Sequence, residues 1–435
     1  MRRRIAATAP ALSLLLLPLL ATGCAEAPDG TGSSTDRAVG DVNELARLHA
    51  ERDYFTLRER LGEPSSDEPP GIRVLRAATA HAFNDLERSN RLLEAVLAEG
   101  SSVSDSLRRE ARRLRARNLL RLHRYGEAAE VFGALTRDPP ASADSAAVAD
   151  DRNFLRATRA LADVPPQRVT ARAPTVLPEV GRTHVEVTIG DSVRDYAIDT
   201  GANFSVLIRS EAEGLGLEIR EAGLVVGSST ERTVTADLAV ADRVRLGGIE
   251  LRDVVFLVVP DEMLTFPGLV IRGLVGFPVV EALGEVTFRP DGAVEVPVEV
   301  PERRVQNLAL HELTPYVRVG YRGDDLLCVL DTGNLETHFY EPFHRRYRTR
   351  VESAGTRDTF RSGGAGGVSE IPGYGLDQVT LGVGDTTATL NDVEVWSTPI
   401  RSASSNVVDC NLARDVLSAH GAYTLNFRSM SVLLR

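Results

Sequence analysis

The sequence predicts a mainly β protein built from two tandem, similar lobes that follow an α-helical domain. From about residue 181 onward, short runs with alternating apolar residues, such as "THVEVTIG" and "GAVEVPVEV", are separated by Gly and Asp, as in strands joined by turns. One pattern of two strands followed by Asp-Thr-Gly occurs twice in this region. Residues 41–137 differ, because Leu, Ala and Arg dominate there and recur at helical spacing.

Length and composition set the broad class of the protein. The 435 residues exceed one ordinary hydrophobic core and predict about three modules. With 43% hydrophobic and 26% charged residues, the chain resembles soluble globular proteins. Its net charge is −11, and removal of the first 23 residues, which contain three arginines and no acidic residue, changes the charge to −14. An acidic surface argues against nucleic acid as a partner.

The N-terminus is predicted to direct export. Arg2-Arg3-Arg4 precede the apolar run "ALSLLLLPLL", which is too short for a membrane-spanning helix and fits a signal peptide over residues 1–23. The following Ala21-Thr22-Gly23-Cys24 resembles a bacterial lipobox. That resemblance implies cleavage before Cys24, lipidation of its thiol, and a lipid-anchored protein in the bacterial cell envelope. The alternative is a plain cleaved signal peptide with an incidental cysteine.

Three segments follow before the β region. Residues 24–40 are rich in Gly, Ser and Thr and are predicted to be a flexible tether. In the helical domain, 41–137, the segment "RYGEAAEVFGALTRDPP" resembles the second helix of a tetratricopeptide (TPR) repeat, a module that offers a surface for protein partners, and a plain helical bundle is the alternative. Its apolar residues at helical spacing are Tyr125, Ala128, Phe132 and Leu135. The Pro- and Ala-rich residues 138–178 are predicted to be a linker with one short helix near 153–162.

An internal repeat defines the β region. "YAIDTGANFSVL" contains Asp199, and "LCVLDTGNLETHFY" contains Asp331, 132 residues later. The strands before them repeat at the same offset, so that Val185 matches Val317 and Val187 matches Val319. Each copy also ends in a strand that finishes with Phe-Arg. A single Asp-Thr-Gly is explained by a tight turn, but two behind matching strands predict two equivalent lobes, 179–300 and 301–435.

These residues resemble the aspartic proteases, and most closely the bacterial retropepsin-like proteins with Asp-Thr-Gly-Ala, over about residues 175–435. Two tandem lobes imply a pepsin-like, bilobal double-psi β-barrel fold. The resemblance implies that Asp199 and Asp331 are the catalytic pair and that Thr200 and Thr332 hydrogen-bond across the lobes. The remaining motif positions, where backbone N–H groups approach the carboxylates, are Gly201 and Gly333.

The chemistry of such a pair follows from electrostatics. Two carboxylates about 3 Å apart cannot both stay ionised, so they share one proton. The ionised member takes a proton from a water held between them, and the other protonates the intermediate. An extended polypeptide is the expected substrate, without a metal or other cofactor. Segments 225–239 and 361–375 stand where the family has a covering flap, and an ordinary flexible loop is the alternative for the second.

The second copy departs from the family pattern. Asn334 follows its glycine, where it is expected to donate a hydrogen bond to Asp331. The apolar-apolar-glycine element, Leu274-Val275-Gly276 in the first lobe, reads Leu412-Ala413 in the second, with Cys410 where a further glycine is common. The added methyl and thiol are expected to crowd the loop. Cys410 and Cys328 either form a disulfide or remain two buried thiols.

Three classes of function therefore remain. The first is an active aspartic endopeptidase. The second is an inactive protease-fold module that binds peptides in the same cleft. The third is a helical-repeat scaffold in which the β lobes are only structural. Substitution of the aspartates distinguishes them, because only the first class depends on both carboxyl groups.

Overall fold

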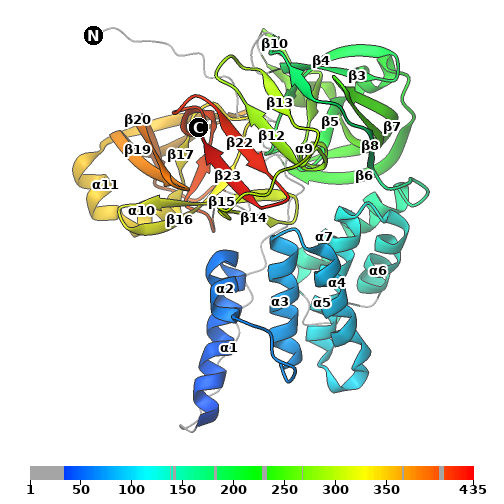
Figure 1. Ribbon diagram of the computed structural model, residues 1–435, viewed down its shortest axis with the longest axis vertical. Helices are drawn as coiled ribbons and strands as arrows, with labels where there is room; N and C mark the ends of the chain where they lie inside the picture. The colour runs from blue at the N-terminus through cyan, green and yellow to red at the C-terminus, as the bar shows by residue number, and fades with distance from the viewer. Residues whose placement is uncertain are drawn as a thin grey trace. The chain divides into compact units, whose positions relative to one another are not determined.

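The computed structural model describes residues 34–137, 139–140, 144–180, 184–227, 233–266, 268–364, 367–400 and 406–435 (Figure 1). They form two compact units. The first is helical and comprises residues 34–166 with Ala309–Glu312. The second comprises Gln167–Leu308 and Leu313–Arg435 and contains the β lobes. The predicted signal peptide and Cys24 lie outside the described residues.

In the helical unit, helices that follow one another in the sequence pack against each other. Its helices are α1 (Ser34–Ala50), α2 (Tyr54–Leu61), α3 (Pro70–Ala82), α4 (Leu86–Ala98), α5 (Asp105–Arg121), α6 (Tyr125–Arg137) and α7 (Ser145–Ala160), with a 3₁₀ turn at Gly100–Ser102. Four of them have an N-cap residue whose side chain accepts a hydrogen bond from a backbone N–H of the first turn. Such an N–H group has no acceptor within the helix itself. These caps are Asp53, Asp85, Ser104 and Asp144. None of the helices described has the length and apolar composition needed to cross a membrane.

The apolar spacing predicted for α6 is confirmed. Its four apolar positions, from Tyr125 to Leu135, are all buried. Phe132 stacks on Phe154 of α7 with ring centroids 5.4 Å apart. The TPR character of these helices remains a prediction, because helix pairs alone do not distinguish a TPR from another helical array.

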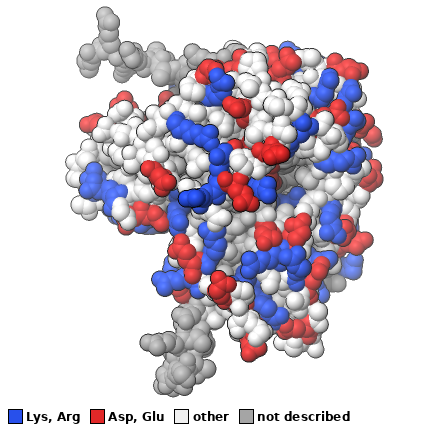
Figure 2. All heavy atoms as spheres, viewed as in Figure 1, with Lys and Arg blue, Asp and Glu red and all other residues white. Residues whose placement is uncertain are grey.

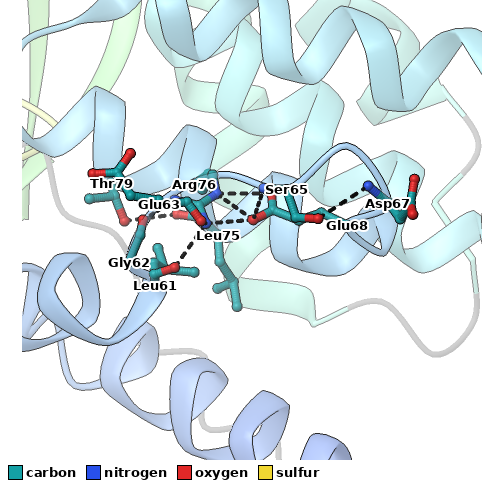
Figure 3. A network of polar contacts seen from close by, with 9 residues as sticks. All are labelled: Leu61, Gly62, Glu63, Ser65, Asp67, Glu68, Leu75, Arg76 and Thr79. Atoms are coloured by element: carbon teal, nitrogen blue, oxygen red, sulfur yellow. Dashed lines mark hydrogen bonds and ion pairs between the residues drawn. The ribbon is translucent and has the colours of Figure 1, made fainter.

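A network of polar contacts fixes the connection between α2 and α3 (Figure 3). The Arg76 guanidinium pairs with Glu68 and donates to the carbonyl oxygens of Leu61, Gly62 and Glu63 at 2.8, 2.8 and 3.0 Å. These carbonyls lie at the end of α2, where they lack helical partners. Because the Arg76 and Glu68 side chains are only 7% and 10% exposed, each ion depends on the other for its solvation.

The first β lobe is a closed ring of strands. Its elements are β1 (Arg168–Ala171), β3 (His184–Ile189), β4 (Ser192–Ile198), β5 (Ser205–Ile208), α8 (Arg209–Gly214), β6 (Ile219–Gly227), β7 (Thr233–Leu246), β8 (Ile249–Val259), the 3₁₀ turn Asp261–Leu264, β9 (Thr265–Phe266), β10 (Leu269–Val270), β11 (Gly273–Val275) and α9 (Phe277–Leu283). The order β8-β5-β11-β4-β3-β7 closes because β7 also pairs with β8. Such closure makes a barrel and removes exposed strand edges.

The second lobe repeats this order. Its elements are β14 (Leu308–His311), β15 (Thr314–Tyr321), β16 (Asp324–Leu330), β17 (His338–Phe339), α10 (Glu341–Arg346), α11 (Arg348–Ala354), β18 (Thr356–Gly364), β19 (Gly367–Val383), β20 (Thr386–Trp396), β21 (Cys410–Leu412) and α12 (Arg414–Leu417). The order β20-β17-β21-β16-β15-β19 closes through the pairing of β19 with β20. The mainly β character predicted for this part of the chain is therefore confirmed, and the two sheets share one strand order.

A third sheet joins the two halves of the sequence. Its strands are β2 (Thr175–Leu177), β12 (Glu285–Phe288), β13 (Val294–Val296), β22 (Tyr423–Asn426) and β23 (Ser431–Leu434). Figure 1 shows β22 and β23, in red, beside β12, with which β22 pairs antiparallel. Phe288 stacks on Tyr423 with ring centroids 4.6 Å apart. The two strands predicted to end each copy thus lie side by side, and this shared sheet belongs to neither lobe alone.

The structure differs from the sequence prediction at the segment boundaries. The predicted linker, 138–178, contains all of α7, which begins at Ser145 and is much longer than the helix expected near 153–162. The same segment contains β1 and β2, which pair with β8 and β13. Helix α1 begins at Ser34, inside the predicted tether. Tertiary partners stabilise α7 and both strands, and the local composition of the segment does not reveal such partners. Composition alone therefore predicted a linker.

Candidate active site

Both aspartates of the repeated motif stand at the end of a barrel strand. Asp199 follows β4, and its N–H donates to the carbonyl of Val275 at 2.9 Å. Asp331 follows β16, and its N–H donates to the carbonyl of Leu412 at 3.0 Å. In each lobe the accepting strand runs parallel to the strand that carries the aspartate. Both aspartates are completely buried, so the fold holds two carboxyl groups away from water.

The threonines of the two motifs hydrogen-bond across the lobes. The Thr200 N–H donates to Thr332 Oγ1 at 3.0 Å, and the Thr332 N–H donates to Thr200 Oγ1 at 3.1 Å. Each hydroxyl in turn donates to a carbonyl of the opposite lobe, Thr200 to Leu330 at 3.0 Å and Thr332 to Ile198 at 3.2 Å. These four reciprocal bonds fix the two Asp-Thr-Gly loops relative to each other.

The glycines of the motifs bring the carboxyl groups together. The Gly201 N–H donates to Asp199 Oδ1 at 2.8 Å, and the Gly333 N–H donates to Asp331 Oδ1 at 3.0 Å. A Cβ atom on Gly201 would lie 2.8 Å from Asp331 Cγ, and one on Gly333 would lie 2.5 Å from Asp199 Cγ. Each glycine therefore lies directly against the carboxyl group of the other lobe, at a position where any side chain clashes.

The surroundings of the two carboxyl groups differ. Asp331 Oδ1 accepts the N–H groups of Gly333 and Asn334, and its Oδ2 accepts Asn411 Nδ2 at 3.0 Å. Asp199 Oδ2 has no hydrogen-bond partner among the described residues. Burial, and then the nearby charge of Asp331, raise the pKa of Asp199 well above its usual value. A raised pKa favours the protonated form of the Asp199 carboxyl group.

Asn334 contributes differently from the sequence expectation. Its backbone N–H, rather than its side chain, donates to Asp331 Oδ1 at 3.1 Å. Its Nδ2 donates instead to Asn411 Oδ1 at 3.4 Å. The sequence analysis missed Asn411. The sequence did contain a hint, because Asn411 is polar where the first lobe has the apolar Leu274. Its proximity to Asp331 follows only from the parallel pairing of β21 with β16.

The altered element of the second lobe keeps the geometry of the first. The Ala413 N–H donates to Thr337 Oγ1 at 2.9 Å, as the Gly276 N–H donates to Ser205 Oγ at 3.1 Å. Ala413 is fully buried, and the bond from the Asp331 N–H to the Leu412 carbonyl is retained, so the added methyl leaves the hydrogen bonding of the loop intact. A Cβ on Gly276 would lie 2.2 Å from a backbone oxygen, so only the second lobe has room for alanine.

Cys328 and Cys410 form a disulfide, which settles the alternatives left open by the sequence. The two cysteines are directly opposite each other on the parallel strands β16 and β21, with Cα atoms 4.5 Å apart. The bond therefore links the strand that leads to Asp331 with the strand that carries Asn411. The sulfur of Cys410, which was predicted to crowd the loop as a thiol, is part of this disulfide.

Both segments predicted to cover the site are β hairpins. In the first lobe β6 pairs with β7, and residues 228–232 between them lie outside the described residues. In the second lobe the glycine-rich segment is part of β18 and β19, which pair antiparallel as far as Gly364 and Gly367. This excludes an irregular loop for most of residues 361–375, and the role of the hairpins as covers remains a prediction.

Two histidines of the second lobe stack on aromatic side chains. His338 stacks on Trp396 with ring centroids 4.0 Å apart, and burial lowers its pKa to about 4. His344 stacks on Tyr374 at 5.5 Å. Within the described ranges, no three His, Cys, Asp or Glu residues are grouped so that they could hold a metal ion.

Comparison with known proteins agrees with the topology. A family model described as "Aspartyl protease" matches residues 185–279, which include β3 to β11 and Asp199. The first lobe is therefore similar in sequence to aspartyl proteases over these residues. A crystal structure of a retropepsin-like aspartic protease from Rickettsia conorii is similar, with 15% identity and a TM-score of 0.22, over 30% of this chain and 94% of that one. A search of curated proteins gave no match.

Proposed function

We propose that the β unit is an aspartic endopeptidase that hydrolyses peptide bonds of an extended polypeptide. The observation that carries the proposal is the pair of buried carboxyl groups, each packed against the glycine of the other lobe. Their separation is fixed by four hydrogen bonds across the lobes. Preorganised acids and bases of this kind lower the barrier to attack by water.

The reaction needs one ionised and one protonated carboxyl group. The ionised carboxylate removes a proton from water as the water oxygen bonds to the peptide carbonyl carbon, and the protonated carboxyl group gives its proton to the carbonyl oxygen. The resulting neutral diol then collapses. A proton moves to the amide nitrogen, the C–N bond breaks, and a carboxylic acid and an amine are released. The pair recovers its single proton over the cycle, so no cofactor is required.

The expected pH dependence follows from the residue after the first motif. Ala202 has no hydroxyl to hydrogen-bond the ionised pair. We therefore expect a pH optimum nearer to neutral than that of pepsin, where such donors stabilise the charge. A rate profile that peaks below about pH 4 would contradict this reasoning.

The test is cleavage of a diverse peptide library by the full chain between about pH 3 and 8. We expect Asp199→Asn and Asp331→Asn each to abolish cleavage, with a loss of at least about a thousandfold. Asp195→Asn is the matched control, because Asp195 is exposed on β4 and should keep full activity. No cleavage by a folded wild-type chain would contradict the proposal and favour the peptide-binding module.

We also propose that the protein is exported and anchored by lipid at Cys24. The lipobox-like sequence and the Cys328–Cys410 disulfide support this, since disulfides persist outside the reducing cytoplasm. The helical unit would then offer a surface for a protein partner. On the face shown in Figure 2, acidic and basic side chains are interspersed, which fits polypeptide partners better than nucleic acid. Labelling with a radioactive fatty acid that persists in Cys24→Ala would refute the anchor.

A further inference from the structure

Asn411 lies where the first lobe has an apolar residue. The carbonyls of Val275 and Leu412 accept the same hydrogen bond in the two lobes, so Asn411 corresponds to Leu274. The Asn411 side chain is only 3% exposed. A buried amide is costly unless its polar atoms are paired, so an asparagine here requires a partner of definite chemistry.

That partner is the carboxyl group of Asp331. Asn411 Nδ2 donates to Asp331 Oδ2 at 3.0 Å, while Asn411 Oδ1 accepts from Asn334 Nδ2 at 3.4 Å. Together with the N–H groups of Gly333 and Asn334, the amide gives Asp331 three donors spread over both oxygens. Donors of this kind stabilise a carboxylate and disfavour its protonated form.

Asp199 has no equivalent donor. The backbone N–H groups of Gly201 and Ala202 interact with it, as those of Gly333 and Asn334 do with Asp331, but its Oδ2 is unpartnered within the part of the chain that the structure describes. Leu274 stands where an amide would be needed. Among the described residues, Arg414 of α12 and Tyr340 after β17 also act on the pair, and the Tyr340 hydroxyl hydrogen-bonds the Asn411 side chain as well. Arg414 lowers the pKa of Asp199 by less than burial and Asp331 raise it.

We propose that Asn411 is a positioning residue that makes Asp331 the ionised member of the pair and leaves the shared proton on Asp199. On the proposed function, on which this inference rests, Asp331 then removes the proton from the attacking water. Asp199 protonates the peptide carbonyl oxygen. The assignment derives from one amide that breaks the symmetry of two otherwise equivalent lobes.

The test exchanges the two residues. Asn411→Leu gives the second lobe the side chain of the first, and Leu274→Asn gives Asp199 the missing donor. In Asn411→Leu, which lacks the amide, we expect the acid limb of the kcat/KM profile to move up by about 1 to 2 pH units, since a hydrogen bond to a charged group has that magnitude. With the amide added beside Asp199, we expect the basic limb to move down by about the same amount, because the second proton is then lost more easily.

A structural role predicts a different result. If Asn411 only supports the fold, Asn411→Leu lowers kcat/KM equally at every pH and leaves both limbs in place, which would overturn the proposal. Thermal unfolding of each variant identifies a protein that fails to fold. If Asn411→Leu does not fold, the position of the basic limb of the kcat/KM profile of Leu274→Asn tests the proposal, and an unmoved limb would overturn it.

A direct titration separates this inference from the proposed function. The carboxyl ¹³C signals of aspartate-labelled full chain are assigned with Asp199→Asn and Asp331→Asn and followed with pH. We expect Asp331 to titrate first and Asn411→Leu to reverse or abolish that order, whether or not peptides are cleaved. Asp199 titrating first in the wild type would refute the assignment, whereas the expected order without cleavage would refute only the protease.

Discussion

The threonine pair provides the most direct test of how the site is assembled. Thr332→Val replaces a hydroxyl by a methyl of similar volume. It removes the acceptor of the Thr200 N–H at 3.0 Å and the donor to the Ile198 carbonyl at 3.2 Å. Thr332 is completely buried, so water cannot replace either bond. The variant therefore leaves a backbone N–H and a carbonyl of the first lobe without these partners.

The magnitude follows from these two bonds. Each contributes a net ~1 kcal/mol to the free energy of unfolding, and a buried donor without a partner costs a further 1 to 3 kcal/mol or so. We therefore expect Thr332→Val to destabilise the β unit by about 3 to 5 kcal/mol. Because Thr200 makes the reciprocal pair of bonds, Thr200→Val should cost about the same.

The assay uses the single tryptophan of the chain. Trp396 is buried in the second lobe, so its fluorescence during urea unfolding reports on the β unit rather than on the helical unit. Thr359→Val, on an exposed position of β18, is the matched control and should change the free energy of unfolding by less than about 0.5 kcal/mol. We also expect kcat/KM to fall by roughly a hundredfold in Thr332→Val, as displaced reacting groups do. A Thr332→Val protein as stable as this control would refute the role assigned to the threonines.

Three further predictions concern the disulfide, the dyad and the helical unit. Replacement of Cys328 and Cys410 by alanine should lower the free energy of unfolding by about 2 to 5 kcal/mol, because the bond closes a loop of 82 residues; unchanged urea midpoints by Trp396 fluorescence would contradict this. Since the pKa of Asp199 is raised in the folded state, its contribution to stability is complete below its unfolded pKa, near 3.8, and is lost as pH rises toward its folded pKa. Asp199→Asn should thus gain stability relative to wild type as the pH of urea unfolding is raised, and parallel curves would refute the raised pKa. Arg76→Met should destabilise the helical unit by about 3 to 5 kcal/mol, because Glu68 is left buried without its partner; helical circular dichroism measures this, and Arg76→Met with Glu68→Gln should recover part of the loss.

The duplication was predictable because it lies in local pattern. In both copies the alternating valines of the first strand, Val185 and Val187, Val317 and Val319, point into a barrel and are buried. A period of two places one set of residues in the core, so a matching pattern at a fixed offset predicts matching strands. The pairing of β7 with both β3 and β8, which closes the ring, is visible only in the structure, since it depends on contacts between separate strands.

The helical boundary was not predictable from the same kind of pattern. Helix α7 lies in a segment that is Pro- and Ala-rich as a whole, and Phe154 of this helix stacks on Phe132 of α6. Short helices are marginal by themselves and gain most of their stability from tertiary packing. A sequence reading that weighs only composition therefore extends the linker through such a helix.

The site divides in the same way. Asp199 and Asp331 stand out because an Asp-Thr-Gly ends each repeated strand, and nothing non-local is needed to find them. Asn411 and the Cys328–Cys410 disulfide depend on the parallel register of β21 with β16, which no local pattern encodes. Residues that tune a site from a neighbouring strand are for this reason harder to predict than residues that carry its motif.

The departures of the second lobe are better explained as one connected set than as separate losses. Asn334 bonds Asn411, Asn411 bonds Asp331, and Cys410, beside Asn411, is bonded to Cys328. Independent decay of a lobe would leave buried polar atoms unpaired, yet within the described ranges the unpaired oxygen of the dyad belongs to Asp199, in the lobe that keeps the family pattern. A substitution that restores the family residue at only one of these positions should therefore reduce activity, because it removes one partner from a network whose other members remain buried.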